Sequence, residues 1–366
     1  MKRSFLALFL LFYVQDAFGQ SVRVSGVVSD AETGELLIGV NVFFDETTNG
    51  TATDDLGYYT LSNIPLGKSK LVFSYLGFER VVITLKDVPK ADTTIHVKLR
   101  AESLDLPSIT VSGSRKAWKK NLKRFKKVFL GDTKNADKTK IKNPEVLRFS
   151  KDGERFSAIS VEPLIIVNKA LGYEIEYQIE EFYSEEETVK IQGFTRFYPL
   201  SGSKKDETKW VSERRRAYNG SFRHFIYTLS SPDSSFYEKS GFQVYYLDKQ
   251  GLNDPSPVDL STIKKASDFY KQDPNSNLLV LHKPEKSKIL AVLYTRENPE
   301  RRLSMLYQQM NENNQGSWIE FFGKDASLDA RTGLLFPFSQ IRLNGYWGIT
   351  GRIPELLPKN YKPGHS

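Results

Sequence analysis

Between residues 22 and 99 the sequence alternates apolar and polar side chains, and turn-forming residues interrupt the alternation about every eight to twelve positions. The turns place glycine where the backbone needs a positive φ, and Asp or Asn where a side chain can cap its own backbone, as in residues 30–34 and 49–50. Short strands at this spacing are typical of two packed sheets. The segment therefore predicts a seven-stranded β-sandwich.

Several short strings within this segment resemble a known family. They are VSGVV at 24–28, TGELLIGVNV at 33–42, GTATD at 50–54, GYY at 57–59 and SYLGFE at 74–79. Their order and spacing resemble the carboxypeptidase-regulatory-like domain, a transthyretin-like β-sandwich. That family occurs alone, beside other domains, or at the N-terminus of outer-membrane TonB-dependent receptors of Gram-negative bacteria. The resemblance implies a fold over about residues 22–99 and carries no peptidase activity with it.

The first 19 residues have the layout of a secretory signal peptide. A positive start precedes the unbroken apolar run of residues 5–14, and Ala17 and Gly19 place small side chains before a cleavage site at Gln20. The run is too short to cross a bilayer as a helix, and no later segment is long and apolar enough. We therefore expect an exported protein, periplasmic or associated with the outer membrane, with no transmembrane segment in the mature chain.

The sequence contains no cysteine. An exported protein without disulfides must draw its stability from its hydrophobic core. The composition also excludes a lipid anchor on a cysteine of this sequence, a thiol nucleophile and a thiolate metal site.

Most of the net positive charge lies in one segment. Residues 115–142 hold 12 basic and 2 acidic side chains, whereas the whole chain carries a formal net charge of +8. Within this segment Trp118, Leu122, Phe125 and Phe129 recur at the spacing of one helix face, which predicts a basic amphipathic helix. Its other face would carry the side chains that we predict to contact a membrane or a partner: Lys119, Lys120, Lys123, Arg124, Lys126 and Lys127. Alternatively, the aromatic face docks on the second domain and the cations are only solvated.

The remaining sequence predicts an α+β domain. Alternating or continuous apolar patterns predict strands at 163–167, 173–183, 188–198, 241–247, 277–282 and 288–295. Residues 207–229 predict a helical region with a candidate break at Asn219-Gly220, and a short helix is expected at Pro354. Three stretches resemble an uncharacterised domain of other exported bacterial proteins: 129–131 with 143–147, 217–225, and the tail around 346–347.

Together these patterns predict a mainly β fold with some α. We expect a signal peptide over 1–19, a transthyretin-like β-sandwich over 20–100, a linker and basic helix over 101–142, and an uncharacterised α+β domain over 143–366. Residues 101–114 resemble the stretch that follows this sandwich in the receptors, where the sheet edge of another protein can engage it. We favour the simpler interpretation, that they are a linker strand.

The sequence lacks most of the common catalytic motifs. The sequence has no His-Glu-x-x-His, no Gly-x-Ser-x-Gly and no phosphate-binding glycine loop. His282 and Glu285 match the His-x-x-Glu half of a carboxypeptidase zinc site, but the only later histidine is His365 at the terminus, so we expect no catalytic zinc. His224 lies among aromatic residues and is interpreted as a core or boundary histidine. The glutamates of 180–187 are interpreted as charged residues of a hairpin.

Two classes of function remain. The first is a non-catalytic binding or scaffold protein of the cell envelope, whose domains form one rigid body and whose basic helix touches anionic lipid or an envelope protein. The second is an envelope hydrolase that acts on glycan or peptide through carboxylates or His224 of the second domain. A cleft with convergent carboxylates and shifted pKa values would favour the hydrolase. We expect the first class, with no cofactor, and with no nucleic-acid partner because the chain is exported.

The signal peptide yields a direct prediction. The mature protein should begin at Gln20 and fractionate with the cell envelope, because small side chains at Ala17 and Gly19 fit the peptidase that removes such leaders. N-terminal sequencing of the protein from envelope fractions checks this. A cytoplasmic protein that retains Met1 would contradict export.

Overall fold

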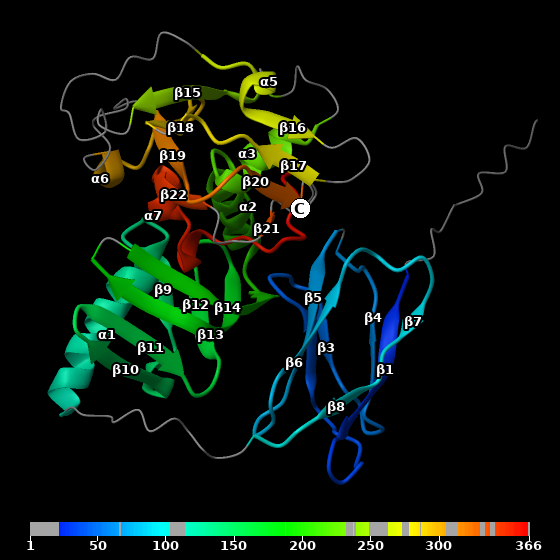
Figure 1. Ribbon diagram of the computed structural model, residues 1–366. Coiled ribbons are helices and arrows are strands. Elements are labelled where there is room, and N and C mark those ends of the chain that lie inside the picture. Colours follow the sequence, from blue (N-terminus) through cyan, green and yellow to red (C-terminus); the bar gives the residue numbers. More distant parts are fainter. Residues whose placement is uncertain are drawn as a thin grey trace, which may run out of the picture.

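The computed structural model describes residues 22–65, 67–102, 114–186, 188–231, 237, 239–248, 263–272, 278–285, 287–304, 314–329, 334–336 and 341–364. The predicted signal peptide, most of the segment 101–114 and His365 lie outside the described residues. The fold is mainly β with few helices and is organised around three large hydrophobic cores (Figure 1). No helix in the described part of the chain has the length and apolar character of a membrane span.

The N-terminal segment is the expected β-sandwich, coloured blue and cyan in Figure 1. One sheet places β1 between β4 on one side and β7 and β8 on the other, and the second sheet has the order β3-β2-β5-β6. The strands are β1 (Val24–Asp30), β2 (Asn41–Phe44), β3 (Gly50–Ala52), β4 (Tyr58–Leu61), β5 (Ser69–Ser74), β6 (Val81–Leu85), β7 (Thr93–Thr94) and β8 (Val97–Leu99). Alternate residues of β1, such as Val24 and Val28, are fully buried between the sheets.

The expected strand at 94–99 is present in two pieces, because the chain approaches β1 very closely between them. Both β7 and β8 pair in parallel with β1. A Cβ atom at Gly26 would lie 1.9 Å from the carbonyl oxygen of Ile95, so only glycine fits this position. The amide of Val27 donates to His96 Nδ1 instead of to a backbone carbonyl, at 3.2 Å.

A six-stranded sheet forms the second core, together with the basic helix. β13 pairs with β14 along one edge and with β12 and then β11 along the other, while β9 and β10 extend the sheet beyond β12 and β11. The elements are α1 (Arg115–Leu130), η1 (Ala136–Lys138), β9 (Thr139–Ile141), η2 (Pro144–Val146), β10 (Leu147–Asp152), β11 (Arg155–Ser160), β12 (Leu164–Asn168), β13 (Tyr173–Glu185) and β14 (Thr188–Pro199). Of these elements, α1, β12, β13 and β14 were predicted from the sequence, whereas β9, β10 and β11 were not.

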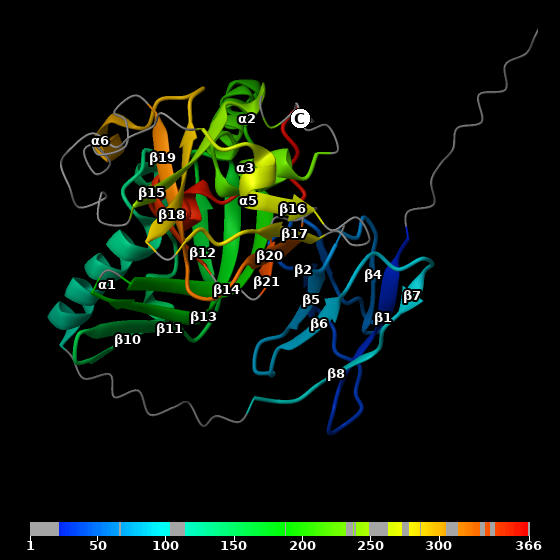
Figure 2. The ribbon, with the colours of Figure 1, turned by 45° about the horizontal axis from the view of Figure 1, so that its top comes forward.

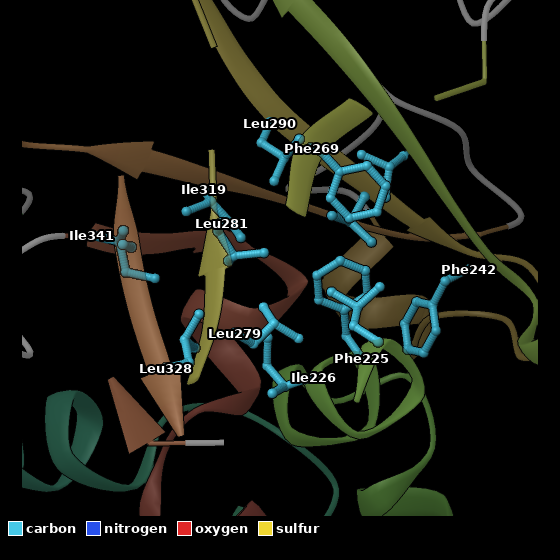
Figure 3. Close-up of a cluster of buried hydrophobic side chains, with 14 of the residues drawn as sticks. Phe225, Ile226, Phe242, Phe269, Leu279, Leu281, Leu290, Ile319, Leu328 and Ile341 are labelled. Carbon is cyan, nitrogen blue, oxygen red and sulfur yellow. The ribbon is translucent and has the colours of Figure 1, made fainter. Parts of the chain in front are cut away.

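The third core lies between two further four-stranded sheets and α3. Their strand orders are β15-β18-β19-β22 and β16-β17-β20-β21. Figure 3 shows Phe225 and Ile226 of α3 pointing into one cluster with Leu279, Leu281 and other strand residues, all of them buried. The strands are β15 (Phe242–Asp248), β16 (Tyr270–Gln272), β17 (Leu278–Leu281), β18 (Lys288–Tyr294), β19 (Gln315–Phe321), β20 (Ala326–Asp329), β21 (Leu334–Phe336) and β22 (Ile341–Gly345).

Two consecutive helices, α2 and α3, lead from the six-stranded sheet to the third core (Figure 2). A break at Asn219-Gly220, where we expected one, separates α2 from α3. α2 begins with a capping box of Ser203 and Asp206 and packs Trp210 against Gly172, where a Cβ would lie 2.2 Å from the indole ring. The helices are α2 (Lys204–Tyr218), α3 (Phe222–Leu229), α5 (Ala266–Phe269), α6 (Arg301–Ser304), α7 (Tyr346–Thr350) and η5 (Ile353–Glu355).

The sandwich is attached to the six-stranded sheet through the turn that follows β2. The amide of Glu46 donates to the Thr195 carbonyl at 2.7 Å, and the amide of Phe197 donates to the Thr47 carbonyl at 2.9 Å. The turn therefore continues the hydrogen-bond ladder beyond β14, an edge strand that would otherwise present unpaired backbone groups. Phe43, Val72 and Phe194 bury an apolar cluster beside this ladder.

The C-terminal tail fastens the same turn from the other side. The amide of Lys359 donates to the Glu46 carbonyl at 2.7 Å, and its ammonium group lies 3.0 Å from the Glu46 carboxylate. Arg223 of α3 holds the tail by donating to the carbonyl oxygens of Pro358, Lys359 and Tyr361. Sandwich, sheet and tail are thus joined by backbone hydrogen bonds as well as by side chains.

Asp45 is buried at this junction. Its Oδ1 accepts the amide of Thr195 at 2.9 Å, and only 5% of the residue is exposed. Burial, together with the neighbouring charge of Glu46, raises the pKa of Asp45 to about 7. Between about pH 4 and pH 7 the carboxyl of Asp45 is therefore protonated in the folded protein but ionised in the unfolded chain.

This titration predicts how stability depends on pH. Since the folded pKa is raised above the unfolded value of 3.8, the contribution of Asp45 is complete below about pH 4 and is lost as the pH rises to about 7. Asp45→Asn keeps an acceptor for Thr195 without a charge. In urea unfolding it should match wild type near pH 4 and be more stable at pH 8, by roughly 2–4 kcal/mol.

Asp55→Asn is the matched control, because Asp55 is an exposed aspartate of the same sandwich. Its unfolding curve should follow wild type at both pH values. Equal stability of Asp45→Asn and wild type at pH 8 would show that the buried carboxyl does not govern the junction.

Candidate functional site

The aromatic face of α1 is buried in the second core. Phe125 and Phe129 are fully buried and stack on each other with ring centroids 4.7 Å apart. Phe125 also lies 4.7 Å from the ring of Phe182 on β13, and the indole Nε1 of Trp118 donates to the Leu147 carbonyl at 3.2 Å. The apolar stripe found in the sequence is therefore part of the fold and does not face a membrane.

The cations of α1 lie on its opposite, outward face. Lys119, Lys120, Lys123, Arg124 and Lys127 are exposed, and Lys126 is half-buried. Within the described residues none of these six side chains forms an ion pair. Arg124 is partly engaged, because its guanidinium lies 4.5 Å from the ring centroid of Phe156. The helix thus presents to solvent a strip of positive charge that its own fold does not neutralise.

A polar cavity of about 610 Å³ lies where the second and third cores meet. Its lining comes from Lys134 after α1, from α2, from residues 297–301, from Gln315 at the start of β19 and from Tyr346 at the start of α7. The lining side chains include four cations and two carboxylates. The cavity has no signature in the sequence, because its walls come from five distant segments.

Glu300 organises one wall of the cavity. Its side chain is 7% exposed, its Oε2 accepts the amide of Lys134 at 3.0 Å, and its Oε1 accepts from the guanidinium of Arg216 at 3.0 Å. On the neighbouring wall Asn219 donates its side-chain amide to Glu297 at 2.6 Å. These contacts fix the two carboxylates and Arg216 in place before any ligand arrives.

A smaller chamber of about 20 Å³ adjoins the cavity and reaches Glu355. Burial raises the pKa of Glu355 to about 6, although hydrogen bonds from Thr133 and Asn135 oppose the shift. These bonds occupy both carboxylate oxygens, at 2.5 and 2.8 Å. Burial, followed by the charges of Glu355 and Glu300, raises the pKa of Tyr346, so its phenol stays a protonated donor at neutral pH.

This arrangement bears on the hydrolase alternative. The molecule has a cleft that contains Glu297 and Glu300 and leads to Glu355, whose pKa is raised. However, each of the three carboxylates accepts a hydrogen bond from the protein itself, and both oxygens of Glu355 and Glu300 are engaged. Glu300 and Glu355 therefore hold parts of the fold together, whereas Glu297 keeps one oxygen without a partner among the described residues. The cleft and the raised pKa of Glu355 are the two features that favour the hydrolase alternative.

The histidines singled out in the sequence have structural surroundings. His224 Nδ1 accepts the amide of Gly220 at 3.1 Å, and burial, followed by the charge of Arg296, lowers the pKa of His224 to about 4. His282 Nδ1 lies 2.9 Å from Asp325 and not on a shared metal position with Glu285, which pairs with Lys288. Among the described residues, no group of three or more His, Asp or Glu side chains is arranged to hold a metal ion.

The glutamates near the β13–β14 turn pair with cations. Glu181 pairs with Lys190, and Glu185 pairs with Arg155 at 3.2 Å. Glu180 occupies a bulge in β13 and pairs with Arg80 of the sandwich. Glu187 lies outside the described residues.

Comparison with known proteins identifies the first domain. Residues 24–111 match the family model described as CarboxypepD_reg-like domain. The same N-terminal region resembles TonB-dependent receptor P3 of Formosa agariphila, with 35% identity over 111 residues, and TonB-dependent receptor SusC of Bacteroides thetaiotaomicron, with 37% identity over 89 residues. These alignments cover 30% and 23% of this chain but only 11% and 9% of the receptors, so the chain spans about a tenth of their length.

Among solved structures, a type II cohesin–X-dockerin complex from Acetivibrio cellulolyticus matches 22% of this chain and 58% of that chain, at 18% identity and a TM-score of 0.19. A likeness at this level carries no functional argument. The N-terminal assignment therefore rests on the family model and on the receptor sequences, which agree with the sandwich seen in the structure.

The docking of α1 predicts the effect of shortening its aromatic face. Phe125→Ala removes a fully buried ring that contacts Phe129, Phe149 and Phe182, and should lower the free energy of unfolding by about 3–5 kcal/mol. Lys123→Gln, two residues away on the exposed face, should leave thermal and urea unfolding unchanged. A Phe125→Ala protein as stable as wild type would show that α1 is not held in this core.

Proposed function

We propose that this protein is an exported, non-catalytic binding protein of the cell envelope, periplasmic or associated with the outer membrane. Its sandwich, at 20–100, and its second domain, at 143–366, act as one rigid body. The basic helix within 101–142 contacts an anionic membrane surface. The observation that carries this proposal is the unpaired positive strip of α1, defined by Lys119, Lys120, Lys123, Arg124, Lys126 and Lys127.

The geometry of α1 supports a surface contact. Because the aromatic face is locked in the core, the helix cannot insert sideways into lipid, and its exposed cations interact through charge alone. Lysines near an anionic bilayer contribute about 1 kcal/mol each, and the attraction falls off over a Debye length. Because several lysines lie along one face of a rigid helix, they can approach a flat membrane surface at the same time.

The envelope setting is supported by the N-terminal features. The leader has the layout of a signal peptide, and the sandwich belongs to a domain type that also occurs in TonB-dependent receptors. The junction of Asp45, Glu46 and Thr47 with β14 supports the rigid-body arrangement, since a shared backbone ladder resists rotation of one domain against the other.

Vesicle co-sedimentation tests the proposal. The mature chain should bind vesicles of phosphatidylglycerol and phosphatidylethanolamine but not vesicles of phosphatidylcholine alone. Replacing Lys119, Lys120, Lys123 and Lys127 together by Gln should weaken binding by about 4 kcal/mol, on the order of a thousandfold, and raised salt should reproduce the loss for wild type.

A matched control removes equal charge elsewhere. Lys86, Lys90, Lys204 and Lys205 are exposed lysines outside α1, and their combined replacement by Gln should leave vesicle binding intact. Thermal melts should be unchanged for both quadruple variants. If the two variants lose binding equally, net charge alone is responsible; if neither loses it, α1 is only a docked structural helix.

A further inference from the structure

We propose that the cavity of about 610 Å³ between the second and third cores binds an acidic saccharide, whose carboxylate pairs with Arg215. None of the six cations of the α1 strip lines the cavity, so this site is separate from the membrane contact proposed above. A cavity of this volume is typical of small-molecule sites, which occupy roughly 300–1,000 Å³.

Unpaired positive charge in the lining indicates an anionic ligand. Arg216 is committed to Glu300, but among the described residues neither Arg215 nor the ammonium group of Lys134 has an ion-pair partner. Both side chains are exposed and line the cavity. A guanidinium binds a planar carboxylate through two parallel hydrogen bonds, which makes Arg215 the natural partner for such a group.

The rest of the lining suits a ligand with many hydroxyl groups. Gln315 is 4% exposed, and its Oε1 is sealed from solvent against Gly220, so this residue forms part of the wall without offering that oxygen to a ligand. Glu297 uses one oxygen for Asn219, and its second oxygen has no partner in the described part of the chain. The protonated phenol of Tyr346 supplies a donor beside this acceptor.

This mixture of groups favours an acidic sugar over a phosphate. Phosphate and a uronate carboxylate are both anions, so the carboxylates of the wall do not distinguish them by charge. A phosphate dianion has one proton to donate to the free oxygen of Glu297, whereas a saccharide has several hydroxyl groups. Sugar hydroxyls both donate and accept, and therefore use carboxylate and phenol groups alike. A neutral sugar would leave the charge of Arg215 unused, whereas a uronic acid satisfies the arginine and Glu297 together.

Isothermal titration of the mature chain with digalacturonate tests the inference. We expect one binding site, no binding of the methyl ester of the same disaccharide, and no displacement by inorganic phosphate. Arg215→Gln should weaken binding at least about tenfold, the usual effect of losing a charge-assisted hydrogen bond. Lys209→Gln is the matched control, because Lys209 is an exposed cation of the same helix that does not line the cavity.

The alternative outcomes are distinct. Absence of binding to the acid, equal binding of acid and ester, or displacement by phosphate would each overturn the inference. If a melt shows that Arg215→Gln is unfolded, Lys134→Gln takes its place and should also weaken binding. Vesicle binding should be unchanged by Arg215→Gln, so failure here and failure of the membrane proposal can be told apart.

Discussion

The long strand β13 is the constraint on which the rest of the structure depends. It pairs with β14 on one side and with β12 and β11 on the other. Tyr177 and Phe182, two of its buried side chains, contact the aromatic face of α1, and Arg214 of α2 lies 4.2 Å from the ring of Tyr173 at its start. Glu180, at the bulge of β13, forms an ion pair with Arg80 of the sandwich. One strand therefore positions both flanking helices and helps to orient the N-terminal domain.

The edge strand β14 is where the sandwich is attached to the six-stranded sheet. An exposed edge is a site for unwanted pairing with other chains, and covering it removes that hazard. The turn at 45–47 covers it with backbone hydrogen bonds, at the cost of burying Asp45, whose charge is disfavoured there. The docked tail, held by Arg223, closes the junction from outside.

The two candidate surfaces differ in how their charges are balanced. On α1 the cations face solvent and their neighbours within the helix are also basic, so the strip acts through its summed field. In the cavity, Arg216 pairs with Glu300, and in the adjoining chamber Glu355 is held by Thr133 and Asn135. Among the described residues, Arg215 and Lys134 of the cavity lining have no ion-pair partner. The first arrangement suits an extended charged surface and the second a small polar ligand.

The sequence by itself determined the β-sandwich, the strands β12 to β14, the helical break at Asn219-Gly220 and the amphipathic character of α1. Each of these depends on neighbours in the chain: alternation, turn residues and helical spacing. The strand β9 and the cavity were not predicted, because pairing partners such as Ile141 and Ile166, or Lys134 and Glu300, are far apart in sequence. The hairpin of β10 and β11 was missed although its strands are joined by the two-residue turn between Asp152 and Arg155, which is a local signal. Only the tertiary structure decided that the aromatic face of α1 points inward, since periodicity defines a face but not what covers it.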